Sequence, residues 1–220
     1  LNRPPVNALS EELSNDLYGA FGECASDSVR AVVITGRPHF AAWADIKGFQ
    51  VAYDSGKEER LAGALVDAIW KLERLDKPTI AAVHGYALGG GLELAMGCDF
   101  RYLAEDAKVG QPEIKLGIIP GAGGTQRLTR IVGIQRAKDL VYTGRQVEAS
   151  EALSMTLADK VFATDELLDR SMEAAAKLAA GPTKALAAAK RAINAGIGEP
   201  MSRAMEIEAE AFNQCFWTDD

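Results

Sequence analysis

Two short apolar runs, each ended by a glycine, constrain most strongly what this chain can fold into. Residues 30–36 read RAVVITG and residues 79–85 read TIAAVHG. An unbroken apolar run of this length, stopped by glycine, is typical of a strand buried on both faces, so we expect strands at 30–36 and 79–83. An amphipathic helix capped by Ser10 precedes the first run, and a second helix over residues 61–75 precedes the second. This alternation predicts a layered α/β domain.

The strand-and-loop pattern repeats only weakly, and beyond residue 125 it gives way to a helical pattern. Each strand leads through a glycine into a loop of small residues, at 41–45 and at 89–93, without the fixed spacing of a strict solenoid repeat. Beyond residue 125 the periodicity predicts helices at 125–131, 135–142, 150–156, 166–180, 184–195 and 201–212. We therefore divide the chain into an α/β core over residues 1–147 and a helical region over residues 148–220.

The composition excludes several classes of function. The 220 residues carry 24 basic and 31 acidic side chains, a net charge of -7, which is the wrong sign for a protein that binds a phosphate backbone. The longest uncharged stretch, residues 78–92, is short and interrupted by glycines, so we expect no membrane span. Two histidines and three scattered cysteines offer no metal-ligand spacing, and the odd cysteine count favours a reducing compartment, with the cytoplasm as the default.

Three consecutive glycines at residues 89–91 lie between the second strand and a helical stretch. They suit either an anion held by backbone N–H groups or a tight turn with close helix–strand packing, and for a glycine triplet alone the second is commoner. Neither a Walker loop nor a dinucleotide-binding fingerprint fits, since residues 121–126, GAGGTQ, end in the wrong residue.

Two carboxylates follow these glycine-rich segments. Glu93 lies in the first turn after the triplet, and Glu113 follows Pro112 at the expected start of a short helix. Each alone is best explained as a carboxylate that complements a helix N-terminus. Together, at the ends of strand-linked loops, they suggest one site where a general acid and a general base divide the work.

Three segments in order resemble the enoyl-CoA hydratase/isomerase (crotonase) family, over nearly the whole chain. They are residues 40–47, FAAWADIK, residues 84–95, HGYALGGGLELA, and residues 110–127, which begin GQPE and end PGAGGTQR. The resemblance implies a spiral of ββα repeats followed by a helical region that builds trimers, often paired into hexamers. It also implies an acyl-CoA thioester substrate, no further cofactor because coenzyme A belongs to the substrate, and no metal.

The resemblance assigns roles to eight residues. Glu93 and Glu113 match the two catalytic glutamates of the hydratases, and Ala44 and Gly90 match the positions whose N–H groups form the oxyanion hole. The segment that lines the coenzyme A site contains Ala42, Asp45, Ile46 and Lys47. Hydration of a 2-enoyl thioester develops negative charge on the thioester oxygen, which two N–H donors stabilise. We expect Glu93 to activate the water and Glu113 to supply the proton to C2.

Two alternatives stay open at this point. A double-bond isomerase needs only one carboxylate to move a proton, and an acyl-CoA-binding paralogue without turnover is suggested by Trp43, where the family has glycine. Thr156 also replaces a family glycine, in a helix-to-strand turn, and we expect a cost in stability there. The sequence ends at Asp220, before the family's final helix, from which we expect weaker oligomerisation and looser coenzyme A binding.

Overall fold

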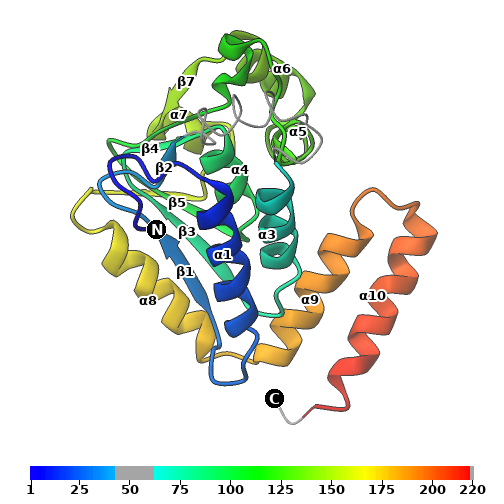
Figure 1. The fold of residues 1–220 in the computed structure, drawn as a ribbon. Coiled ribbons are helices and arrows are strands. Elements are labelled where there is room, and N and C mark those ends of the chain that lie inside the picture. Colours follow the sequence, from blue (N-terminus) through cyan, green and yellow to red (C-terminus); the bar gives the residue numbers. More distant parts are fainter. Residues whose placement is uncertain (43–61, 219–220) are drawn as a thin grey trace.

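Two four-stranded sheets form the centre of the molecule. The computed structural model describes residues 1–42 and 62–218 (Figure 1). The first sheet has the strand order β1-β3-β5-β8, all parallel, with bounds Val32–Thr35, Thr79–Val83, Phe100–Ala104 and Lys160–Phe162. The second has the order β2-β4-β6-β7, with bounds Ala41–Ala42, Tyr86–Leu88, Lys108–Gly110 and Gln146–Glu148, and only β7 is antiparallel to its neighbour.

Strands β1 to β6 alternate between the two sheets. The pairs β1 and β2, β3 and β4, and β5 and β6 each contribute one strand to the first sheet and one to the second. Each turn of the chain therefore adds one rung to both sheets, and helices follow the turns: α3 (Gly63–Glu73) follows β2 and α4 (Gly90–Met96) follows β4. This confirms the predicted spiral of ββα repeats.

The expected helices form close to their predicted bounds. Helix α1 spans Glu11–Glu23, and the Ser10 side chain accepts a hydrogen bond from the Leu13 N–H at 3.2 Å, as predicted for its N-cap. The helices of the second half are α5 Gly124–Val132, α6 Ile134–Thr143, α7 Ala149–Ser154, α8 Leu167–Ala179, α9 Thr183–Gly196 and α10 Met201–Cys215. A short 3₁₀ helix, η2, spans Pro112–Leu116.

Two strands lie in the part of the chain where we expected only helices. Strands β7 and β8 have three residues each, too few for a period-2 pattern, and they form because Val147 pairs with Val109 and Val161 with Leu103. Helix α8 then packs on β1, β3 and β5. The sheets thus extend to Phe162, and the division at residue 147 stays a prediction.

The last two helices project from the sheets as a hairpin (Figure 1). Helix α9 is tied to the body by Lys190, whose ammonium group lies 3.0 Å from the Asp99 carboxylate and 3.1 Å from the Lys77 carbonyl oxygen. Helix α10 contacts α9 and has no buried residue. In the described ranges, 1–42 and 62–218, no helix is both long and apolar enough to cross a membrane.

Thr156 has the conformation that its family position implies. It lies between α7 and β8 with a φ of 65°, in the left-handed region, which costs an L-residue roughly 1–2 kcal/mol relative to ordinary helical backbone. The expected strain at this turn is therefore present, at an exposed position.

Close packing of α4 on β2 yields a test of the fold. A Cβ at Gly91 would collide with the carbonyl oxygen of Ala41, whereas one at Gly19, exposed inside α1, would meet nothing within 4 Å. We expect Gly91→Ala to lower the free energy of unfolding by about 3 kcal/mol, because backbone must move. Gly19→Ala, the matched control, should raise it by about 0.5–1 kcal/mol, because alanine loses less backbone entropy. Chemical denaturation measures both, and equal effects would contradict this packing.

Candidate active site

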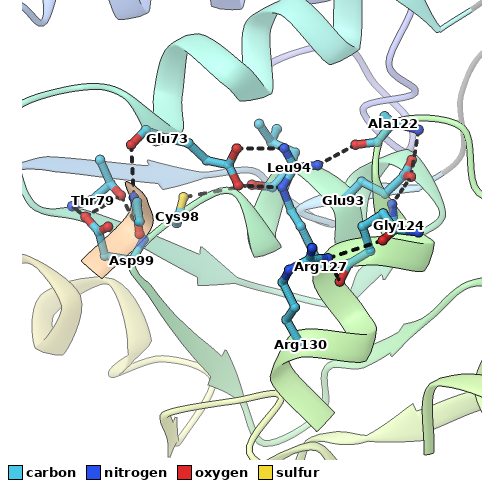
Figure 2. A network of polar contacts seen from close by, with 12 residues as sticks. Glu73, Thr79, Glu93, Leu94, Cys98, Asp99, Ala122, Gly124, Arg127 and Arg130 are labelled. Carbon is cyan, nitrogen blue, oxygen red and sulfur yellow. Dashed lines mark hydrogen bonds and ion pairs between the residues drawn. The ribbon is translucent and has the colours of Figure 1, made fainter. Parts of the chain in front are cut away.

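Glu93 is a buried carboxylate held by two backbone donors. It lies in the first turn of α4 and is 2% exposed. Its Oε1 accepts hydrogen bonds from the N–H groups of Ala122 and Gly124, both at 2.7 Å (Figure 2). Burial raises the pKa of Glu93, while these two N–H donors and the Arg127 charge oppose that rise by stabilising the ionised form.

The turn that carries these donors depends on glycine. Gly123 has a φ of 95°, which directs the amides on either side of it to one oxygen. At Gly124 a Cβ would lie 2.9 Å from Glu93 Oε1 and 2.7 Å from the Gln111 amide, so a side chain there would displace the carboxylate. Sequence reasoning tested these glycines only for a nucleotide motif and as part of the family pattern, and it missed their contact with Glu93.

Glu113 is the second buried carboxylate. It lies in η2 and is 8% exposed. Burial raises the pKa of Glu113 to about 7; its own backbone N–H opposes the rise and the neighbouring Glu93 charge adds to it. The fully buried Gln111 is a partner that the sequence did not reveal. We assign its amide orientation from its neighbours, since this orientation lets the amide nitrogen donate to both Glu113 oxygens, at 2.9 and 3.1 Å.

Strand register explains why residues twenty positions apart meet. Ala42, Leu88 and Gly110 end three neighbouring parallel strands and pair in one row across the second sheet. The segments after Leu88 and Gly110 therefore leave the same edge of the sheet, and they carry the second and third family motifs. Glu93 follows Leu88 and Glu113 follows Gly110, and the charge of one carboxylate acts on the other. The structure brings the two predicted carboxylates together, while their catalytic roles stay predictions.

The other predicted site residues divide into two groups. Gly90 is the first residue of α4, where the N–H has no partner inside the helix, and it follows Gly89 with a φ of 58°. Ala42 is buried at the end of β2, and its N–H donates to the Val6 carbonyl oxygen at 2.9 Å. The predicted oxyanion donor Ala44, the departure Trp43 and the other three predicted coenzyme A residues, Asp45, Ile46 and Lys47, lie outside the described residues.

Neither a metal site nor another pocket among the described residues offers an alternative to this candidate site. Within ranges 1–42 and 62–218, no group of three His, Cys, Asp or Glu side chains is arranged to hold a metal ion. A groove of about 770 Å³ lies between α1, α3 and the α9–α10 hairpin, with Trp70, Lys71 and Arg191 among its walls. It contains neither Glu93 nor Glu113, so it is not the candidate active site.

Comparison with known proteins decides the family. A family model described as enoyl-CoA hydratase/isomerase matches residues 1–220. The chain belongs to the enoyl-CoA hydratase/isomerase family. This confirms the resemblance drawn from the three motifs.

Individual relatives cover the whole chain. A short-chain-enoyl-CoA hydratase from Clostridium acetobutylicum is 42% identical over 100% of this chain and 85% of its own. A crotonyl-CoA hydratase from Syntrophomonas wolfei is 44% identical over 100% of this chain and 86% of its own. The crystal structure of an enoyl-CoA hydratase from Thermoplasma volcanium superposes with a TM-score of 0.92 at 34% identity, covering 100% of this chain and 88% of that one. The predicted fold class is thereby confirmed.

The Gln111–Glu113 contact predicts a measurable shift. Gln111→Met removes a donor that stabilises the ionised carboxylate, so the pKa of Glu113 should rise above its value of about 7 by about 1. A ¹³C NMR titration of the labelled glutamate side chains measures it. Gln126→Met, on the exposed face of α5, is the control and should leave that pKa unchanged. A downward shift in Gln111→Met would contradict the assigned amide orientation.

Proposed function

We propose that this protein is an enoyl-CoA hydratase that adds water across the 2,3 double bond of a 2-enoyl-CoA thioester. The single observation that carries the proposal is the pair of buried carboxylates, Glu93 and Glu113, at one edge of the second sheet in unequal electrostatic surroundings. The names of the full-length relatives, which include short-chain-enoyl-CoA and crotonyl-CoA hydratases, support the same enzyme class.

The surroundings of Glu93 suit a general base. Both hydrogen bonds from the turn fall on Oε1, and no hydrogen bond within the described part of the chain reaches Oε2. An ionised carboxylate with one oxygen anchored presents the other in a defined direction. We assign Oε2 to the water that attacks C3, with Glu93 accepting its proton.

The surroundings of Glu113 suit a general acid. With a pKa of about 7, a substantial fraction of this carboxyl group keeps its proton near neutral pH. A proton donor is most effective when its pKa lies near the working pH. We assign Glu113 to deliver a proton to C2, so that the water's proton goes to Glu93, its hydroxyl to C3, and the Glu113 proton to C2. The overall addition of one water is then complete once the two carboxyl groups exchange a proton.

The remaining roles follow from the family resemblance. We propose that the N–H groups of Ala44 and Gly90 hold the thioester oxygen, where negative charge develops, and that Ala42, Asp45, Ile46 and Lys47 line the coenzyme A site. The free N–H expected at the first residue of α4 supports the role of Gly90. The proposed reaction uses no metal and no separate cofactor, since coenzyme A enters as part of the substrate.

The two alternatives make different demands on the site. An isomerase needs one carboxylate that moves a proton between C2 and C4, so the second buried carboxylate favours the hydratase. A paralogue that only binds acyl-CoA needs neither carboxylate. Burial of two carboxylates costs free energy, so their presence favours an enzyme over a protein that only binds. Product identification separates hydration from isomerisation, and loss of the enoyl thioester's ultraviolet absorbance separates both enzymes from a binding protein.

Glu93→Gln and Glu113→Gln test the proposed roles. Each change removes a proton acceptor or donor while preserving shape, so the kcat for hydration of crotonyl-CoA should fall at least about 100-fold in each variant. The KM should change much less, because neither carboxylate is assigned to hold coenzyme A. Absorbance at the conjugated enoyl band measures the rate.

Glu151→Gln, on α7 with its side chain 42% exposed, serves as the control and should keep the wild-type rate. Full hydration activity in both active-site variants would contradict the assignment. Conversion of the wild-type substrate to a 3-enoyl product without hydration would show the isomerase instead.

We also propose that the protein is a homotrimer or a hexamer of paired trimers and that it resides in the cytoplasm. In the described part of the chain, the α9–α10 hairpin and the residues next to it carry large exposed apolar side chains: Ile193, Ile197, Met201, Met205, Phe212, Phe216 and Trp217. A second copy of the chain would bury them. The three free cysteines support a reducing compartment.

A charged residue at this surface tests the assembly. Phe212→Glu should reduce the mass measured by light scattering, from three or six times the chain mass toward one, because it puts a charge into the proposed contact. Leu153→Glu, at an exposed apolar position on α7, is the control and should leave the mass unchanged. A wild-type mass of a single chain at all concentrations would contradict the proposal.

A further inference from the structure

We propose that the ion pair between Glu73 and Arg127 is a positioning pair that holds the Glu93 carboxylate in the direction its reaction requires. This inference rests on the proposed function, in which Glu93 acts on the attacking water. Within the described residues neither residue of the pair hydrogen-bonds to Glu93, so both position it through the turn that binds it.

A bidentate ion pair joins helices α3 and α5. Arg127 lies in the first turns of α5, and Glu73 is the last residue of α3. The guanidinium donates from Nε to one Glu73 oxygen at 2.5 Å and from Nη2 to the other at 2.7 Å (Figure 2). Such bidentate pairing fixes both the distance and the plane of the guanidinium. The end of α3 therefore determines where the Arg127 side chain lies.

Arg127 also binds the turn that holds Glu93. Its third nitrogen, Nη1, donates to the carbonyl oxygen of Ala122 at 2.6 Å. The guanidinium also packs against Gly123, where any Cβ would collide with Nη1. Arg127 thus binds the carbonyl oxygen of Ala122 on one side of the turn. On the other side, the N–H of Ala122 donates to Glu93 Oε1.

The Glu73–Arg127 pair is partly buried, which favours a fixed geometry. The Arg127 and Glu73 side chains are only 14% and 25% exposed, whereas the Arg191–Asp76 pair just beyond the same end of α3 is 45% and 54% exposed. Sheltered, hydrogen-bonded pairs are screened less by water and hold a fixed geometry better than surface pairs. Removal of Glu73 would leave Arg127 free to turn away from Ala122.

Three variants test the inference. Glu73→Gln and Arg127→Met should each lower the kcat for crotonyl-CoA hydration about tenfold, with KM changed less than about twofold, since misplacement of a reacting group by a fraction of an ångström slows the chemical step. Asp76→Asn breaks the exposed pair near the same helix end and is the matched control, with kcat within about twofold of wild type. A kcat within twofold of wild type in both test variants would overturn the inference.

The pH profile separates positioning from general loosening. Arg127 lowers the pKa of Glu93, so Arg127→Met should move the acidic limb of kcat/KM to higher pH. Glu73→Gln loosens the turn but keeps the Arg127 charge in the protein, so that limb should move upward less than in Arg127→Met. An acidic limb that stays in place in Arg127→Met, or that rises equally in both variants, would overturn the inference.

A second measurement does not depend on turnover. Amide hydrogen exchange at Ala122 and Gly124 should become about tenfold faster in Glu73→Gln, while exchange in α1 stays as in wild type. Unchanged exchange at both amides would overturn the positioning role, whatever the activity. A wild-type protein that fails to hydrate crotonyl-CoA would instead contradict the proposed function, and the exchange result would still decide whether the pair holds the turn.

Discussion

A carboxylate inside the protein, Glu93, needs hydrogen-bond donors because an unpaired buried charge is costly. Here the donors are two backbone N–H groups of one turn, and much of the surrounding structure serves to place them. The turn needs glycine at 123 for its backbone conformation and at 124 for space. Arg127 donates a hydrogen bond to the Ala122 carbonyl oxygen of this turn, and Glu73 forms an ion pair with Arg127. The position of one oxygen atom thus depends on contacts from α3, α4 and α5.

The spiral fold explains how two distant motifs come to lie in one place. Each turn of the chain adds a strand to the second sheet, and the strands run parallel through β2, β4 and β6. Parallel strands end at the same edge, so the segments that follow β4 and β6 both start there. The two carboxylates then differ in their surroundings: the turn stabilises charge on Glu93, and that charge helps to keep the pKa of Glu113 near neutrality. A difference of this kind divides base from acid.

Most elements were predictable because local pattern and tertiary environment agree. The predicted strand at 79–83 forms with those bounds, and Ser10 caps α1 as its side chain and position suggest. Among the described residues the sequence pattern located only the strands β1 and β3. The other strands were not located from local pattern, and most of them, such as β7 and β8, have three residues or fewer, too few for a readable periodicity. Gln111 escaped for a related reason. A buried glutamine has no local signature, and its importance lies in the partners that folding brings to it.

The sequence by itself determined the α/β class, the order of the helices, the two buried strands β1 and β3, and the two carboxylates after glycine-rich loops, because these depend on residue type and spacing along the chain. Only the tertiary structure decided which donors meet Glu93, how far burial and a neighbouring charge shift Glu113, and which helix end supports Arg127. Those properties arise from groups that lie far apart in sequence and approach within hydrogen-bond distance only when strand register and helix packing are complete. Their energies depend on that approach, since hydrogen bonds and charges act over a few ångströms and strengthen as water is excluded.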